Sequence, residues 1–446
     1  MTAREPDAPR GGSLGRLSRS AIGRLPPGTL QVGFGLSVLG ATSYGFLALA
    51  ARSLSARGFT ELSVVWTALF TLGPGVFLPL EQDIGRRLAV TSDRALMAVV
   101  LRRSLSLAGL LAILVAVATV VASLATGGRL LDRENQLLIA MICANSVLAL
   151  VHTSRGYLAG TGKFGRYGAQ LAIDGSLRAA GAAVLLIAAV HAPAGFAWVL
   201  VGSQIVAIAV TLYGSKPPVA SRHTREQHEP RTSTLARGLG WMLAATLAQQ
   251  ILANAGPIVV KVLAAPGDIA AGHFLTALVL ARVPLFLFAA LQASLLPRLA
   301  ALLAQGHSEA LIGSLRRLLV LLATVGGSVT VILAVFGPAL TAMLFGSEYR
   351  SARAPLVLLS VGCTIYMLAA AVAQALLALH ASASVAAGWW LGVAGFAATL
   401  PFGSDLPLRV CTALVIGSLL SGAWFVFSLA SKLRRFAPQV VDPVVS

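Results

Sequence analysis

The chain has 446 residues, of which 57% are hydrophobic and only 11% charged, and its net charge is +18. Soluble domains carry about 25% charged residues, so this composition excludes a soluble globular protein and predicts an integral membrane protein. Because the basic residues lie in short segments between apolar runs, their excess indicates membrane topology rather than nucleic-acid binding. No Cys/His spacing typical of a metal site is present.

Twelve apolar runs are long enough to cross a bilayer as helices, which takes roughly 20 residues each. A basic polar tail, residues 1–30, comes first, and a second tail, residues 430–446, comes last. Between the sixth and seventh runs lies a segment rich in Pro, Ser, Thr and charge, residues 214–238, which we interpret as a cytoplasmic linker. The predicted spans are 31–51, 62–80, 105–125, 137–158, 167–190, 194–213, 239–263, 272–296, 318–344, 354–379, 384–402 and 408–429.

The distribution of Lys and Arg predicts the orientation of these spans. If the N-terminus is cytoplasmic and the helices alternate, the cytoplasmic segments hold 24 Lys and Arg residues and the external segments hold 8. Positive charge gathers in cytoplasmic loops of membrane proteins. We therefore predict a multi-pass protein with both termini in the cytoplasm. Two arginines, Arg178 and Arg282, fall within spans.

The two halves of the chain resemble each other. Residues 67–78 (TALFTLGPGVFL) align with residues 276–287 (TALVLARVPLFL), and the same offset pairs Arg52 with Lys261. Six spans per half give both halves the same orientation, so such repeats are related by an axis along the membrane normal. The sequence thus predicts an all-α membrane protein with two six-helix bundles, 31–213 and 239–429, and a cleft between helices 1, 2, 7 and 8.

The second helix of each half carries helix breakers at similar depth. Gly73, Pro74 and Gly75 interrupt helix 2, and Pro284 interrupts helix 8. Freed backbone groups are tolerated in a membrane where protein or a cavity covers them. These positions are therefore candidate gating points, and the alternative is a static packing kink. We expect the charged residues 81–87 to mark the point at which helix 2 leaves the membrane.

Three segments resemble the polysaccharide flippases of the multidrug, oligosaccharidyl-lipid and polysaccharide exporter (MOP) superfamily. Residues 50–70 and 259–279 resemble the helix 1–2 and helix 7–8 hairpins of those proteins, and residues 154–168 (SRGYLAGTGKFGRYG) resemble the segment between helices 4 and 5. The resemblance implies a flippase that moves a polyprenyl-(pyro)phosphate-linked oligosaccharide across the bacterial plasma membrane by alternating access, for cell-surface polysaccharide synthesis. It implies a transporter without an enzymatic cofactor, whose partners are the lipid-linked saccharide, the bilayer, and polysaccharide polymerases or glycosyltransferases.

Charges within the spans are the candidate site residues, because a charge at mid-bilayer costs roughly 2.5–3.5 kcal/mol on insertion scales. Arg282 has no acidic residue one turn away, so it is a candidate cation for a pyrophosphate or acidic sugar. The alternative is a structural role, with a partner on another helix or a backbone carbonyl at the Pro284 break. Arg178 is a second candidate, although Asp174 lies four residues earlier and can pair with it. Asp174 is also a weak candidate for proton coupling. Arg155, near the predicted cytoplasmic mouth of helix 4, either meets the lipid phosphate at loading or simply obeys the positive-inside rule.

Other functions stay open at this stage. Cation-coupled multidrug exporters of the same superfamily commonly use an acidic residue in helix 1, but residues 31–51 contain neither Asp nor Glu. A glycosyltransferase would normally show an acidic pair in a large external loop, and the external loops here are short. An ATPase or a hydrolase is disfavoured because no Walker A or G-x-S-x-G motif is present. A non-transporting membrane scaffold is compatible with the sequence. The energy for transport could come from H⁺, Na⁺ or the membrane potential alone, which is worth about 2.3 kcal/mol per charge per 100 mV.

Overall fold

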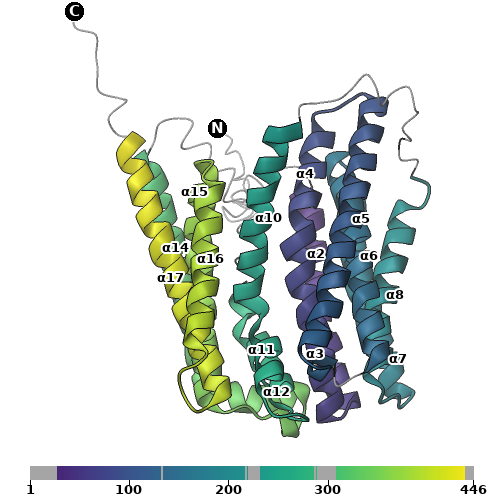
Figure 1. Cartoon of the computed structure of the whole chain (residues 1–446), viewed down its shortest axis with the longest axis vertical. Coiled ribbons are helices and arrows are strands. Elements are labelled where there is room, and N and C mark those ends of the chain that lie inside the picture. Colours follow the sequence, from purple (N-terminus) through teal and green to yellow (C-terminus); the bar gives the residue numbers. More distant parts are fainter. Residues whose placement is uncertain are drawn as a thin grey trace, which may run out of the picture.

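The structure is a computed structural model that describes residues 28–131, 134–215, 218, 232–285, 288 and 308–436. Within these ranges the chain is helical and contains no strand, as the sequence predicts. Figure 1 shows the helices standing side by side in two groups, with α2 to α8 in one group and α14 to α17 in the other.

The first half contains six spans. The second of them, Ala56–Ala89, is continuous but consists of three segments, because a π-helical turn interrupts it. The elements are α2 (Thr29–Ser53), α3 (Ala56–Leu72), η1 (Gly73–Phe77), α4 (Leu78–Ala89), α5 (Arg94–Ala125), η2 (Arg129–Leu131), α6 (Asn135–Gly160), α7 (Phe164–Ile187) and α8 (Pro193–Leu212).

The second half contains a broken span at its start, where α10 and α11 meet at an angle of 60°. Nine helices of the described residues are long and apolar enough to cross a bilayer, and this bent pair makes a tenth. Two further apolar helices, α12 and α16, occupy the places of predicted spans eight and eleven, which accounts for about twelve spans. The elements are α10 (Thr232–Asn254), α11 (Gly256–Leu263), α12 (Ala270–Ala281), α14 (Ser308–Phe345), η3 (Ser347–Tyr349), α15 (Arg353–Ala378), α16 (Ser382–Thr399) and α17 (Leu406–Phe436).

Two long helices extend well beyond their apolar cores. The α5 helix begins at Arg94 rather than near residue 105, and α14 begins at Ser308 rather than near residue 318. Asp93 caps α5 by accepting a hydrogen bond from the backbone N–H of Ala95 at 2.8 Å. Hydropathy detects the part of a helix that lies in lipid, whereas the capping residue sets its true start.

The two halves pack in the same way. In the first half α2 packs on α7 and α7 on α8, and in the second half α10 packs on α16 and α16 on α17. The α5–α6 and α6–α8 pairs likewise correspond to α14–α15 and α15–α17. Because matched helices also run in the same direction, the structure confirms the parallel repeat.

Glycines permit the closest of these helix contacts. A Cβ atom on Gly168 would lie 2.2 Å from the carbonyl oxygen of Gln31, and one on Gly35 would lie 2.3 Å from the carbonyl oxygen of Gly168. Helices in a bilayer associate largely through such close backbone approach, since lipid supplies little hydrophobic drive between them. The α2–α7 pair is therefore built on small residues.

The halves meet tightly at one end of the molecule. We call the end where α8 finishes and α10 begins the linker face, at the top of Figure 1, and the opposite end the far face. At the far face the Thr60 hydroxyl donates to the Ile269 carbonyl at 3.2 Å, and the Phe59 ring packs against Tyr349 with centroids 5.1 Å apart. Arg52 also donates to carbonyl oxygens at the end of α14. These contacts close the far face.

Candidate functional site

Arg282 lies at the point where α12 ends, since its backbone N–H still bonds the Leu278 carbonyl at 3.1 Å. Its Nη1 donates to Oδ1 of Asn254 at 2.7 Å. Its Nε and Nη2 atoms are buried and have no hydrogen-bond partner among the described residues. None of the ion pairs found in that part of the chain includes Arg282. Arg282 therefore has a partner on another helix, as one of the two predictions expected, but that partner is the neutral amide of Asn254 rather than a carboxylate.

Residues from both halves surround this arginine. Asn254, at the end of α10, also reaches the Phe70 carbonyl of α3 at 3.4 Å. Tyr44 of α2 and Tyr366 of α15 are close enough to Arg282 for an electrostatic interaction. Residues of predicted spans 1, 2, 7 and 8 therefore lie around Arg282 together with a residue of the tenth span, α15. A cleft between those four spans stays a prediction.

The predicted helix breaks are present at both positions. Gly73, Pro74 and Gly75 lie in the π-helical turn η1, and the hydroxyl of Thr246 on α10 donates to the freed carbonyl of Gly75 at 2.8 Å. In the second half the helix breaks at Arg282, ahead of Pro284, as expected from the clash between a proline ring and the preceding helical turn. Protein from the opposite half covers the first break. Bending at either break during transport stays a prediction.

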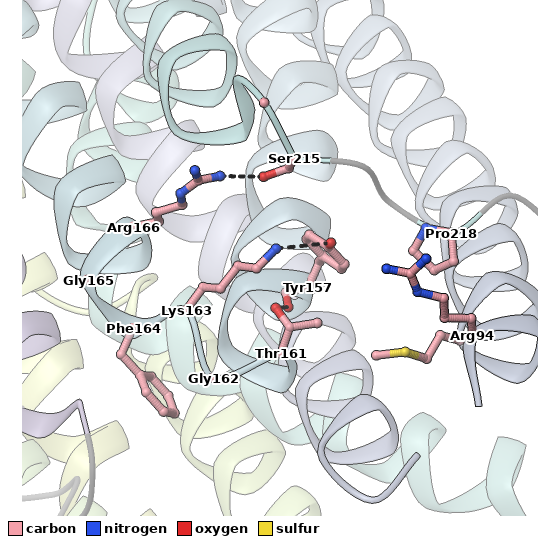
Figure 2. A pocket seen from close by; sticks show the side chains of 12 residues that line it. Arg94, Tyr157, Thr161, Gly162, Lys163, Phe164, Gly165, Arg166, Ser215 and Pro218 are labelled. Atoms are coloured by element: carbon pink, nitrogen blue, oxygen red, sulfur yellow. Dashed lines mark hydrogen bonds between the residues drawn. The ribbon is translucent and has the colours of Figure 1, made fainter. Parts of the chain in front are cut away.

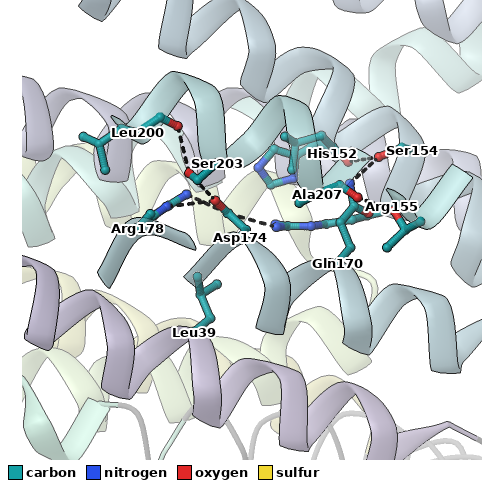
Figure 3. Close-up of polar contacts among 12 residues, drawn as sticks. Leu39, His152, Ser154, Arg155, Gln170, Asp174, Arg178, Leu200, Ser203 and Ala207 are labelled. Atoms are coloured by element: carbon teal, nitrogen blue, oxygen red, sulfur yellow. Dashed lines mark hydrogen bonds and ion pairs between the residues drawn. The ribbon is translucent and has the colours of Figure 1, made fainter. Parts of the chain in front are cut away.

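A second cluster of charge is buried inside the first bundle (Figure 3). Arg178 grips Asp174 with two hydrogen bonds, Nε to Oδ1 at 2.9 Å and Nη2 to Oδ2 at 2.6 Å. The Ser203 hydroxyl donates to Oδ1 at 2.9 Å, and Nη2 of Arg155 lies 3.7 Å from Oδ2. The predicted pairing of Asp174 with Arg178 is confirmed.

The same view shows the side chain of Arg155. The residue lies five positions before α6 ends, it is 8% exposed, and its side chain points into the bundle, toward Asp174. Its Nε atom is buried without a hydrogen-bond partner in the described ranges. Arg155 and Arg178 are thus both directed at Asp174, and contact between either of them and a substrate stays a prediction.

Sequence reasoning missed a third buried group, Glu81. Residues 81–87 continue the helix as α4, and Glu81 is 6% exposed. That the helix leaves the membrane here stays a prediction. Its Oε2 lies 2.7 Å from Nδ1 of His152, and its Oε1 accepts a hydrogen bond from the Tyr167 hydroxyl at 2.6 Å. Asp83 is also buried, and it pairs with the two arginines that follow it.

A periodic signal for Glu81 existed in the sequence. Phe77, Leu80, Ile84 and Leu88 recur at helical spacing, and Glu81 falls within that apolar stripe. An acid on an apolar face needs a buried partner. With Glu61, Asp83 and Asp174, Glu81 is one of four buried carboxylates described in the first bundle, and each of the four has a partner. Within the described ranges, no group of three or more His, Cys, Asp or Glu residues is placed to hold a metal ion.

No protein-family model matches the chain. An uncharacterized protein of Mycobacterium bovis and one of Mycobacterium tuberculosis are each 28% identical to it, over alignments that cover 94% of this chain and 94% of the relative. A further uncharacterized protein of Mycobacterium tuberculosis is 26% identical and covers 94% of this chain and 93% of its own length.

Solved structures with low sequence identity share the fold. An inward-facing multidrug resistance MATE family transporter of the MOP superfamily aligns with a TM-score of 0.67 at 15% identity, covering 96% of this chain and 99% of that one. The outward-facing conformation of such a transporter gives 0.59 at 13%, covering 92% and 95%. A MOP superfamily transporter from Pyrococcus furiosus, described as having a binding pocket of reverse polarity, gives 0.60 at 14%, covering 92% and 95%. This multi-pass membrane protein therefore has the fold of the MATE transporters of the MOP superfamily.

Proposed function

We propose that the chain is a flippase that moves a polyprenyl-(pyro)phosphate-linked oligosaccharide across the bacterial plasma membrane by alternating access. The observation that carries the proposal is the guanidinium of Arg282 between the two halves, which donates to the neutral amide of Asn254 and leaves Nε and Nη2 buried without a hydrogen-bond partner among the described residues. An unpaired cation at such depth is costly. A phosphate or pyrophosphate oxygen would accept those two N–H groups and offset the cost.

The contacts between the halves support the alternating-access part of the proposal. The far face is closed by Phe59, Thr60 and Arg52 against the second half. Under the predicted topology the far face is external, so substrate would enter from the cytoplasm.

The charge of the interface disfavours the alternative of a cation-coupled drug exporter. A basic interior attracts anions and repels cationic drugs. The four buried acids described in the first bundle are already paired: Glu61 with Arg57, Glu81 with His152, Asp83 with Arg87, and Asp174 with Arg178. A transporter of this fold with a binding pocket of reverse polarity has been described as suggesting a different function, which supports a link between pocket charge and substrate.

The energy source in this proposal is the membrane potential. Moving an anion outward is favoured by about 2.3 kcal/mol per charge per 100 mV, so no dedicated ion site is required. A proton-coupling role for Asp174 would require the carboxylate to exchange the paired guanidinium of Arg178 for a proton. Polymerases and glycosyltransferases that build and extend the saccharide would be the functional partners.

The test is complementation of a deletion strain, with lipid-linked saccharide on the cytoplasmic leaflet measured beside protein level. We expect Arg282→Ala to abolish flipping at normal protein level, because one charge-assisted hydrogen bond contributes about 1.5–3 kcal/mol and the substrate would lose two. Arg282→Lys keeps the charge but loses the planar fork, so it should retain part of the activity. The matched control is Arg103→Ala, an exposed cation on α5.

Three outcomes would contradict the proposal. If Arg282→Ala flips normally, the arginine does not bind substrate. If Arg282→Ala merely fails to accumulate, the residue is structural. If the deletion changes resistance to cationic drugs and leaves every lipid-linked saccharide in place, the drug-exporter alternative is correct.

A further inference from the structure

A cavity of about 700 Å³ opens at the linker face of the first bundle, between the ends of α5, α6, α7 and α8. Figure 2 shows three cations around it, Arg94, Lys163 and Arg166, and none of the described residues that line it is acidic. We call it the cationic pocket. Its charge suits an anion.

The described hydrogen-bond partners of Lys163 and Arg166 are neutral. Lys163 donates to the Tyr157 hydroxyl at 3.4 Å and lies 5.1 Å from the centroid of that ring. Arg166 donates to Ser215 and to backbone carbonyls at the end of α8. None of the three cations takes part in an ion pair with the described residues. The pocket is therefore a positive site on a positive face.

A second cavity of about 550 Å³ adjoins the first, sharing Tyr157, Ser215 and Pro218 with it. It is mostly apolar, and Arg102 is the one charged residue among the described residues that line it. Two of its residues, Leu105 and Leu150, are 46% and 50% exposed, so the cavity opens on the lipid side of the bundle. We call it the apolar groove, and its apolar lining includes Ala98, Leu101, Leu105, Leu150, Ile208 and Leu212.

The order of the two cavities along the helices matches the structure of a lipid. Leu105 follows Arg94 by eleven residues on α5, which is about 16 Å deeper into the bilayer at 1.5 Å per residue. Leu150 lies at a similar distance inward from Thr161, which lines the cationic pocket at the end of α6. Charge therefore lies at the surface of the membrane, and the apolar lining lies below it.

We propose that the two cavities form one site for an anionic phospholipid of the leaflet at the linker face. Its phosphate would sit among Arg94, Lys163 and Arg166, and an acyl chain would lie along the groove between α5, α6 and α8. Basic pockets between helices on the cytoplasmic side of membrane proteins bind anionic head groups in this way. The site lies in the first bundle and involves none of the residues around Arg282, so it does not depend on the transport proposal.

Native mass spectrometry of the purified full chain with dioleoyl-phosphatidylglycerol or dioleoyl-phosphatidylcholine tests the site. We expect phosphatidylglycerol to bind in preference to phosphatidylcholine. We expect Arg94→Gln with Lys163→Gln to lower its occupancy at least five-fold; Arg166 is left intact because it holds the end of α8. The matched control is Arg316→Gln with Arg317→Gln, two exposed cations near the same face on α14.

A groove variant and a soluble probe separate a lipid site from a phosphate site. Leu150→Trp should fill the groove and also lower phosphatidylglycerol occupancy, whereas glycerol 1-phosphate at equal concentration should not displace the lipid. The proposal fails if the control variant lowers occupancy as much as the pocket variant, or if glycerol 1-phosphate competes equally. It also fails if stoichiometric polyprenyl phosphate displaces phosphatidylglycerol, since the site would then belong to a carrier lipid.

Discussion

Arg178→Ala is expected to destabilise the first bundle, because it removes the main ion-pair partner of the buried Asp174 carboxylate. The Asp174 carboxylate is 2% exposed and receives both of its short charged hydrogen bonds from Arg178, at 2.9 and 2.6 Å. Removing one partner of a buried ion pair costs roughly 3–5 kcal/mol. Ser203 and the guanidinium of Arg155 at 3.7 Å would remain, which favours the lower end, about 3 kcal/mol.

A loss of about 3 kcal/mol corresponds to a fall of roughly 150-fold in the ratio of folded to unfolded protein. The companion variant, Asp174→Asn with Arg178→Gln, removes both charges and leaves neutral amides that can hydrogen-bond in their place. It should recover most of the loss, because replacing a buried ion pair with neutral groups is far less costly than breaking it. Arg155 retains an electrostatic interaction with Glu81 in that variant.

The measurement is thermal unfolding of the detergent-purified chain, followed by the monodisperse fraction on size exclusion, with membrane protein level as a second readout. Ser203→Ala serves as a calibration, since it removes one hydrogen bond to a charged group, about 1.5 kcal/mol. The reasoning is refuted if Arg178→Ala unfolds at the wild-type temperature. It is equally refuted if the double variant is no more stable than Arg178→Ala.

Three further outcomes are expected. Gly168→Ala should lower the unfolding temperature, because its Cβ would clash with the Gln31 carbonyl. The control, Gly165→Ala, should leave it unchanged, because that Cβ would meet nothing within 4 Å. Equal effects of the two variants would refute the close α2–α7 contact. In a chain whose native cysteines are replaced, Thr60→Cys with Gly272→Cys should form a far-face disulfide that stops transport until reduced, and transport through the cross-linked protein would contradict alternating access. A cysteine replacing Arg129 should react with an impermeant thiol reagent outside intact cells, and protection from it would overturn the predicted orientation.

Features governed by one-dimensional patterns could be predicted from the sequence alone. The transfer free energy of a span depends on its own composition, so about twelve spans, the parallel repeat and the all-helical class follow from hydropathy and spacing. The pairing of Asp174 with Arg178 could also be predicted, because residues four apart on a helix are always neighbours.

Contacts between helices were decided only by the tertiary structure. Glu81 meets His152 and Tyr167, which are 71 and 86 residues away, and Arg282 meets Asn254 rather than an acid. The rotation of each helix about its axis and its distance from its neighbours determine such partners. Both are set by the simultaneous packing of many side chains. A linear pattern can show that a buried charge needs a partner, but only the packed bundle determines which residue supplies it.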